Sequence, residues 1–283
     1  MKTIGETLQQ LVETLTKAGI DEARTDARLL LEHVLDVDRT VLIAYPEREI
    51  SQDQCAELDA LLKRRLNREP MSHLLGYREF WSLRFKVTKE TLTPRPDSET
   101  LIEAVLRHLP DVDAPLNVLD LGVGTGCLIL SVLSEYKKAH GLGIDLSDDA
   151  LRVAIENAKM LGLADRCDFQ IGDWMEGLND QYDLILSNPP YIPTGDKSIL
   201  EPEVLVHEPA TALFAGSDGL DDYRILAQQL PGRLKDDALA VIELGIDQSD
   251  AVLALMESCG LEVIDSPKDL GGIVRCHIIR KKT

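Results

Sequence analysis

A chain of 283 residues, of which 44% are hydrophobic and 28% charged, has the composition of an ordinary globular protein and can bury a sizeable core. It contains no run of 18 apolar residues, and its first residues form an acidic amphipathic pattern, so we expect neither a membrane span nor a signal peptide. Five scattered cysteines form no C-x-x-C pair, which argues against a disulfide framework and against a zinc or other metal site. We therefore expect a cytoplasmic protein.

The net charge of −19 is unevenly distributed. Residues 1–92 carry 14 of the 30 Lys and Arg and 16 of the 49 Asp and Glu, a net of −2. Residues 93–283 hold the remaining 16 and 33, a net of −17. A field of that sign repels a phosphate backbone, so we expect no direct nucleic-acid binding by this part, although acidity also serves solubility. The sequence predicts no oligomeric state.

The first 75 residues show apolar side chains at helical spacing. The three stripes are Leu8, Leu11, Val12 and Leu15, then Leu29, Leu30, Val34 and Leu35, then Cys55, Leu58, Leu61, Leu62 and Leu66. The third stripe also carries a basic run, Lys63, Arg64, Arg65 and Arg68, which is either a solvated face or a docking patch for a partner. Residues 76–97 predict a β-hairpin followed by a stiff Pro94-Arg95-Pro96 segment. Asp97 is expected to cap a helix that runs to about Leu109.

From residue 116 onward, strands and helices alternate. Strands are predicted at residues 118–121, 141–146, 167–171, 182–187, 238–244, 263–265 and 274–279, with helices at 127–136, 149–161, 220–234 and 249–258. This alternation predicts an α/β fold with a parallel sheet covered on both faces.

A glycine loop follows the first of these strands and opens a helix. It consists of Gly122, Val123, Gly124, Thr125 and Gly126. A dinucleotide fingerprint would place a third glycine at position 127, where this chain has Cys, so the G-x-G-x-G spacing favours a nucleoside that lies over the loop without a pyrophosphate. A tight structural turn is the alternative.

Two further positions support a nucleoside site. Asp145 ends the second strand, where its carboxylate can accept hydrogen bonds from both ribose hydroxyls. A helix cap is the alternative role, for which Ser147 is better placed. Asp173 and Trp174 follow the third strand, where the carboxylate could accept from an adenine amine and the indole could stack on the ring or belong to the core.

The tetrapeptide Asn188-Pro189-Pro190-Tyr191 follows a buried strand and so reaches the same sheet edge. Its prolines form a rigid turn without donors, which presents the Asn188 side-chain oxygen and the Pro189 carbonyl as acceptors. Two acceptors that hold an –NH2 group orient it and favour tetrahedral nitrogen, and Tyr191 offers a face for a planar substrate. These four residues are therefore the candidate catalytic residues of a transfer to a planar amide or amine nitrogen.

With these motifs the chain resembles the HemK-like peptide chain release factor glutamine methyltransferases. The likeness also rests on Arg78-Glu79-Phe80-Trp81, on Leu92 to Asp97 with Glu99, on Gly172-Asp173-Trp174, and on Glu208 to Leu213 with Gly219. Val123 stands where Thr is usual and Thr93 where Ile or Val is common, and residues 269–272 match only loosely.

This resemblance implies an architecture and an activity. The architecture is a helical substrate-recognition domain (1–75), a β-hairpin linker (76–97) and a class I, Rossmann-like methyltransferase domain with a mostly parallel seven-stranded sheet (98–283). The activity is methylation of the Gln side-chain amide in the Gly-Gly-Gln motif of class-1 release factors, in translation termination. By position, Gly122 to Gly126, Asp145, Trp174 and Asn188 would contact S-adenosyl-L-methionine.

Two other functions stay open. A methyltransferase that acts on an exocyclic amine of a nucleic-acid base could use the same tetrapeptide, but the acidity of residues 93–283 and the lack of a base-reading module count against it. A non-catalytic S-adenosylmethionine-binding protein would not need an intact Asn188–Tyr191. His207 and Glu208, which lie near the catalytic segment, are expected to have a cap or surface role.

Overall fold

The structure, a computed structural model, describes residues 2–282 and divides into two compact units. The smaller unit comprises Met1–Gly76 together with the short segment Pro202–His207, and the larger unit comprises Tyr77–Glu201 and Glu208–Thr283. No helix among the described residues is both long and apolar enough to cross a membrane.

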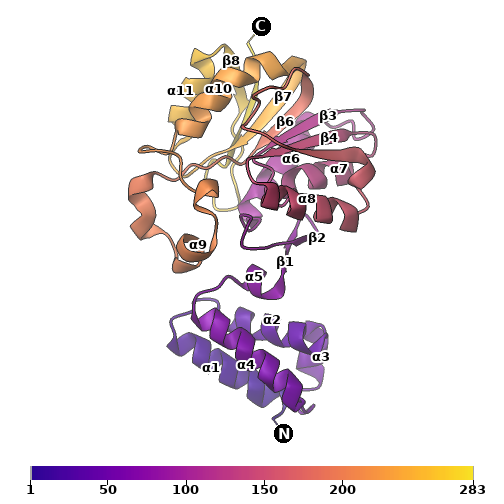
Figure 1. Cartoon of the computed structure of the whole chain (residues 1–283), viewed down its shortest axis with the longest axis vertical. Helices are drawn as coiled ribbons and strands as arrows, with labels where there is room; N and C mark the ends of the chain where they lie inside the picture. Colours follow the sequence, from indigo (N-terminus) through magenta and orange to yellow (C-terminus); the bar gives the residue numbers. More distant parts are fainter. Residues whose placement is uncertain (1, 283) are drawn as a thin grey trace. The chain divides into compact units, whose positions relative to one another are not determined.

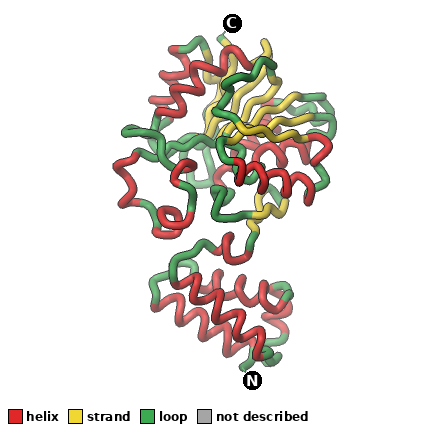
Figure 2. Tube along the Cα trace, viewed as in Figure 1, coloured by secondary structure: helices red, strands yellow, loops and turns green. Residues whose placement is uncertain are grey.

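The smaller unit is all helical, as the red tube of Figure 2 shows. Its helices are α1 (Ile4–Lys17), α2 (Ala23–Leu35), α3 (Arg39–Ala44), α4 (Gln52–Leu66), α5 (Met71–Leu75) and α9 (Pro202–His207). Capping boxes at Thr3 and Ser51 satisfy the first amides of α1 and α4. The predicted stripes supply much of its core, which includes Leu11, Leu15 and Leu30.

Of the basic run at the end of α4, Lys63 and Arg64 are exposed, whereas Arg65 turns into this unit. Arg65 is buried, and its guanidinium donates to Asp26 at 2.7 Å and to Glu203 of α9 at 2.9 Å. Arg68 donates to Glu203 as well, at 3.3 Å. A docking patch made of all four basic residues is therefore wrong for Arg65, because its charge is buried and already paired.

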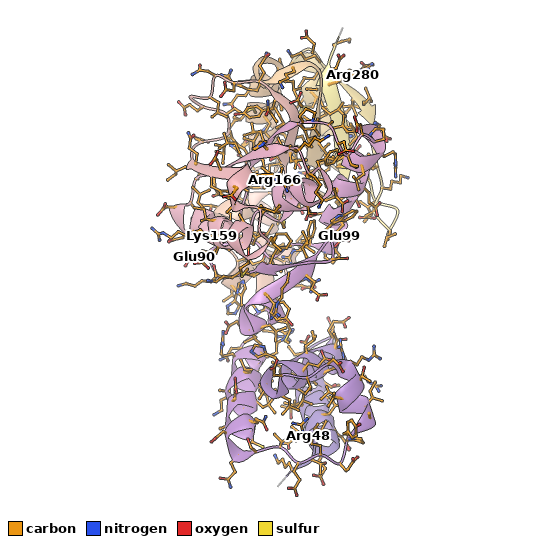
Figure 3. The ribbon with its side chains drawn as sticks, turned by 90° about the vertical axis from the view of Figure 1, so that its right-hand side faces the viewer. Arg48, Glu90, Glu99, Lys159, Arg166 and Arg280 are labelled. Atoms are coloured by element: carbon orange, nitrogen blue, oxygen red, sulfur yellow. The ribbon has the colours of Figure 1, made fainter. Side chains whose placement is uncertain are left out.

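The larger unit begins with the predicted β-hairpin, β1 (Tyr77–Phe80) and β2 (Leu83–Lys86), which closes through Trp81 and Ser82 at positive φ. A 3₁₀ turn, η1 (Pro96–Ser98), then leads into α6 (Glu99–His108). Glu99, labelled in Figure 3, accepts a hydrogen bond from the Trp81 backbone N–H at 2.8 Å and so ties the hairpin to α6. Asp97 was expected to cap this helix, and that prediction is wrong, because Asp97 lies inside η1 and no side chain caps α6.

One seven-stranded sheet forms the centre of the larger unit (Figure 1). In spatial order its strands are β5 (Cys167–Ile171), β4 (His140–Asp145), β3 (Asn117–Leu121), β6 (Tyr182–Ser187), β7 (Leu234–Glu243), β9 (Cys276–Lys281) and β8 (Leu261–Asp265). β9 alone runs in the direction opposite to that of the other six strands. The predicted α/β class with a mostly parallel sheet is confirmed.

Helices cover both faces of this sheet and create two cores. On one face lie α6, α7 (Cys127–Glu135) and α8 (Asp148–Met160), and on the other lie α10 (Asp221–Arg233) and α11 (Ser249–Ser258). Arg166 secures the first layer by donating to the Leu133 carbonyl in α7 and to the carbonyls of Tyr136 and Ala139, in the turn between α7 and β4. Burial on both faces explains why the central strands are continuous apolar runs.

Candidate active site

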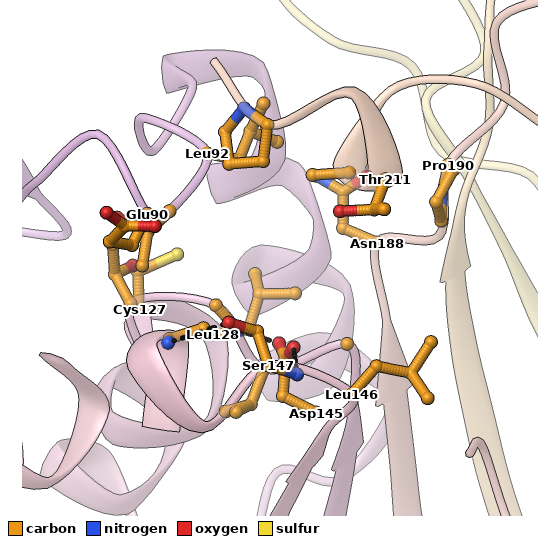
Figure 4. Close-up of a pocket in the computed structure, with 18 of the residues that line it drawn as sticks. Glu90, Leu92, Cys127, Leu128, Asp145, Leu146, Ser147, Asn188, Pro190 and Thr211 are labelled. Atoms are coloured by element: carbon orange, nitrogen blue, oxygen red, sulfur yellow. Dashed lines mark hydrogen bonds between the residues drawn. The ribbon is translucent and has the colours of Figure 1, made fainter. Parts of the chain in front are cut away.

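The candidate site lies at the carboxyl ends of β3, β4 and β6. Strand order reverses between β3 and β6, since the chain first winds outward through β4 and β5 and then returns to the other side of β3. Open α/β sheets bind ligands in the crevice that such a reversal creates. A cavity of about 350 Å³ lies here, of a size that suits a small-molecule ligand (Figure 4).

The glycine loop forms the floor of this cavity. Gly122, Gly124 and Gly126 have φ of +71°, +53° and +80°, a backbone that side chains rarely adopt. The N–H groups of Gly122 and Val123 both donate to the Ile144 carbonyl at 2.9 Å, which ties the loop to β4. Gly122, Val123, Gly124 and Thr125 line the cavity, whereas Gly126 is not among the lining residues.

Asp145 lies at the end of β4 with both carboxylate oxygens in use. One oxygen accepts from the Gly124 N–H and the other from the Ser147 N–H, each at 2.9 Å. The helix-cap role belongs to Ser147, whose hydroxyl accepts from the Ala150 N–H of α8. A carboxylate has about four acceptor positions, so Asp145 keeps capacity for two hydroxyl donors in the cavity that it lines.

Trp174 lines the cavity from the loop after β5, at a positive φ of 49°. Its indole N–H donates to the Asp222 carboxylate. A side chain at Gly122 would point to within 3.8 Å of the indole ring, so glycine keeps the space beside that ring open. Asp173 is exposed and is not among the lining residues.

Two residues of the tetrapeptide after β6 line the cavity, and the other two do not. Asn188 and Pro190 line the cavity, and Figure 4 shows both side chains together with Thr211. Pro189 is buried outside the lining. The Tyr191 ring packs beside Gly245, and its carbonyl accepts from the Gln248 side chain at 2.9 Å. Burial raises the pKa of the Tyr191 phenol to about 12, so this group stays protonated. Stacking of a substrate on Tyr191 stays a prediction.

Known proteins match both parts of the chain. The family model described as PrmC N-terminal domain matches residues 6–76, and the one described as methyltransferase small domain matches residues 97–217. A release factor glutamine methyltransferase from Caulobacter vibrioides is 47% identical over 91% of this chain and 89% of its own length. One from Rhodospirillum rubrum is 42% identical over 99% of this chain and 85% of its own length.

This chain belongs to the release factor glutamine methyltransferase family. Among solved structures, ribosomal protein L11 methylase from Lactobacillus delbrueckii subsp. bulgaricus superimposes with a TM-score of 0.51 at 18% identity, over 69% of this chain and 82% of that one. At that identity the match supports the class I fold alone. The suspected family, the fold class, the enzyme class and S-adenosylmethionine as methyl donor are thereby confirmed.

The residues present fit that cofactor. Gly122 leaves an open space beside the Trp174 indole ring, where an aromatic purine ring can pack, and Asp145 offers free acceptor positions to two adjacent hydroxyls. Ser187 donates to the Leu121 carbonyl at 2.9 Å, so the strand that carries Asn188 is tied to the strand that carries the glycine loop. Asn188 therefore shares one cavity with the proposed cofactor contacts.

The sequence left two lining segments of this methyltransferase without a role. Residues 90–95 line the cavity, and so do Pro209, Thr211 and Ala212, which are distant from them in sequence. Arg95 donates to Glu208 at 2.7 Å, and Thr93 also donates to that carboxylate, so Glu208 fastens the two segments together. Its side chain is buried, which raises the pKa of Glu208 and makes the expected surface role wrong. The family resemblance contained both segments, but only the fold shows that they meet.

Proposed function

We propose that this chain transfers the methyl group of S-adenosyl-L-methionine to the side-chain amide nitrogen of the Gln in the Gly-Gly-Gln motif of class-1 release factors. One observation carries the proposal. Asn188, a neutral acceptor on a rigid proline turn, lines the same cavity as the glycine loop and Asp145. Family membership supports the choice of substrate.

Orientation of the nucleophile is the main task of the site. An amide nitrogen is a poor nucleophile because its lone pair is delocalised into the carbonyl. The Asn188 side-chain oxygen and the Pro189 carbonyl would accept from its two N–H bonds and hold the nitrogen with its lone pair toward the donor. When bound, S-adenosylmethionine supplies a methyl group on a cationic sulfur. Gly122 to Gly126, Asp145 and Trp174 would hold it, with Asn188 as a further contact.

The site needs no strong base. Methylation makes the amide nitrogen acidic, so its proton can leave to water after the transfer. The charged side chains of the lining are Glu90, Arg95 and Asp145, and Arg95 is paired with Glu208. Tyr191 stays protonated and cannot act as a base at neutral pH. Catalysis then rests on positioning and on hydrogen-bond acceptors.

The helical unit would recognise the protein substrate. The family model described as PrmC N-terminal domain covers residues 6–76, and none of the residues that line the cavity lies in this unit. We assign substrate recognition to residues 1–75 and the chemistry to residues 98–283.

Mass spectrometry of the substrate tests this function. A release factor incubated with the protein and labelled methyl donor should gain one methyl group, which peptide fragmentation places on the Gln of Gly-Gly-Gln. A release factor with Gln→Glu at that position should gain none, and neither should the native factor treated with the Asn188→Ala protein. Label that appears in added RNA or DNA instead of the factor, or nowhere while the donor binds, would contradict the proposal.

A further inference from the structure

A buried carboxylate lies directly behind the candidate catalytic loop. The register of the parallel pair β6 and β7 places Ser187 opposite Ile242, so Asn188 and Glu243 are the next residues at the same sheet edge. Ser98, the last residue of η1, lies next to both of them. Glu243 is 1% exposed and Ser98 is 2% exposed, so water cannot replace the bonds between them.

These side chains form a directional chain of hydrogen bonds. Asn188 donates through its side-chain N–H to the Ser98 hydroxyl oxygen at 3.4 Å. Ser98 in turn donates to the Glu243 carboxylate. A hydroxyl has one proton, and an ionised carboxylate only accepts, so the Ser98 proton is committed to Glu243. The hydroxyl can then only accept from Asn188, which leaves the Asn188 oxygen free for another donor.

Glu243 lies outside the cavity and cannot contact a ligand in it directly. It is not among the residues that line the cavity, and its second carboxylate oxygen has no hydrogen-bond partner within residues 2–282. A buried carboxylate with an open acceptor is costly, and such groups persist in proteins mainly where function requires them. The charged and titratable groups that face it are Arg95, Asp97, Tyr191, Tyr223, Arg275, Cys127 and Cys276.

We propose that Glu243 is a positioning residue that acts through Ser98 to fix the orientation of the Asn188 side-chain amide. In this orientation the Asn188 oxygen faces the substrate nitrogen and its N–H groups face the protein. The inference rests on the proposed function, because an oxygen is the correct group only when the substrate presents N–H donors.

Protonation of Glu243 would undo this selection. A protonated carboxyl can donate to Ser98, which frees the hydroxyl proton to bond to the Asn188 oxygen. The Asn188 amide could then turn and present its N–H groups to the substrate. The substrate nitrogen also carries N–H groups, so the two would face each other as donors and form no hydrogen bond. Burial raises the pKa of Glu243 to about 7, with Arg275 and Arg95 opposing the rise and Asp97 adding to it. Turnover should therefore fall as pH drops below neutral.

Nuclear magnetic resonance tests the hydrogen-bond chain without any substrate. The side-chain amide signals of Asn188, assigned by their loss in Asn188→Asp, should shift with pH with a midpoint near that of Glu243. In Glu243→Gln and in Ser98→Ala this shift should disappear. If the signals do not titrate in the wild-type protein, or titrate equally in both variants, the relay does not exist. This result is independent of whether release factors are the substrate.

Kinetics with a Gly-Gly-Gln peptide then tests the consequence. At saturating donor, Glu243→Gln and Ser98→Ala should each lower kcat by about tenfold to a hundredfold, because a misplaced reacting group costs rate. The decline of kcat on the acidic side should vanish in Glu243→Gln, and Ser98→Thr, which keeps the hydroxyl, should recover most of kcat.

Tyr223→Phe provides the matched control. The Tyr223 hydroxyl donates to the Glu243 backbone carbonyl at 2.9 Å, so this variant disturbs the same strand end and leaves the carboxylate in place. It should keep the acidic decline of kcat. Wild-type kcat and an unchanged acidic decline in Glu243→Gln would overturn the proposal, whereas a wild-type protein that methylates no release factor would overturn only the proposed function.

Discussion

Removal of Arg65 should destabilise the helical unit. Arg65 is 7% exposed and Asp26 is 4% exposed, and their charged groups are 2.7 Å apart. In Arg65→Met the Asp26 carboxylate would remain buried without its cation, and Glu203 would lose a partner at 2.9 Å. Loss of one member of a buried ion pair costs about 3–5 kcal/mol. We therefore expect Arg65→Met to lower the free energy of unfolding of this unit by about that amount.

Hydrogen exchange measured by mass spectrometry resolves the effect, because it reports on each unit separately. Amides of α2 and α4 that exchange only on opening of the unit should exchange roughly 100- to 5000-fold faster in Arg65→Met. Peptides from the central strands of the larger unit should be unaffected. Lys63→Met is the control, since Lys63 is exposed on the same helix.

The double variant Arg65→Met with Asp26→Leu separates charge from packing. Replacing both members of a buried pair by apolar residues is often neutral, so the double variant should recover much of the protection that the single variant loses. Unchanged exchange in Arg65→Met would refute the reasoning outright. A double variant as unprotected as the single one would show that the Arg65 stem, rather than its charge, supports the unit.

Substitutions at three positions probe the larger unit. Asp145→Ala should weaken S-adenosylmethionine binding by about 1.5–3 kcal/mol, which calorimetric titration measures, because a charged acceptor is lost. Asn188→Ala should slow methyl transfer by on the order of 10²-fold or more at saturating donor, and Asn188→Asp should retain partial activity. Glu243→Gln should raise the free energy of unfolding at pH 8 by at most about 3 kcal/mol and leave it unchanged below pH 4.5. The sign follows because the folded state raises the pKa of Glu243 from 4.5 to about 7, so the wild type loses stability as pH rises through that interval.

Elements flanked by turn or polar residues were the most predictable part of the fold. The predicted strands at residues 167–171 and 182–187 and the predicted helix at 249–258 have the bounds that the structure shows. Strand β7 begins at Leu234, four residues before the predicted start. Its first residues include the exposed Asp236 and Asp237. An exposed strand end carries no apolar pattern to detect.

The glycine loop, Asp145 and Asn188 were found from sequence because each follows a recognisable strand. Glu243 was not found, because a glutamate at the end of a strand is usually exposed, and nothing local marks its contact with Ser98. Arg65 was misjudged for the same reason. Its partners Asp26 and Glu203 are distant in sequence. The sequence pattern therefore grouped the buried Arg65 with the basic residues that were expected on the surface.

The placement of charge around Asn188 follows from the chemistry of a neutral nucleophile and a cationic donor. A carboxylate at position 188 would attract the sulfonium before reaction, when its charge is greatest, and so would stabilise the ground state more than the transition state. Asn188→Asp should therefore bind the donor more tightly while it turns over more slowly. A carboxylate two hydrogen bonds away, at Glu243, can set the orientation of the neutral Asn188 amide through Ser98 without lying in the cavity. Tighter donor binding with faster turnover in Asn188→Asp would contradict this division between a neutral contact and a buried charge.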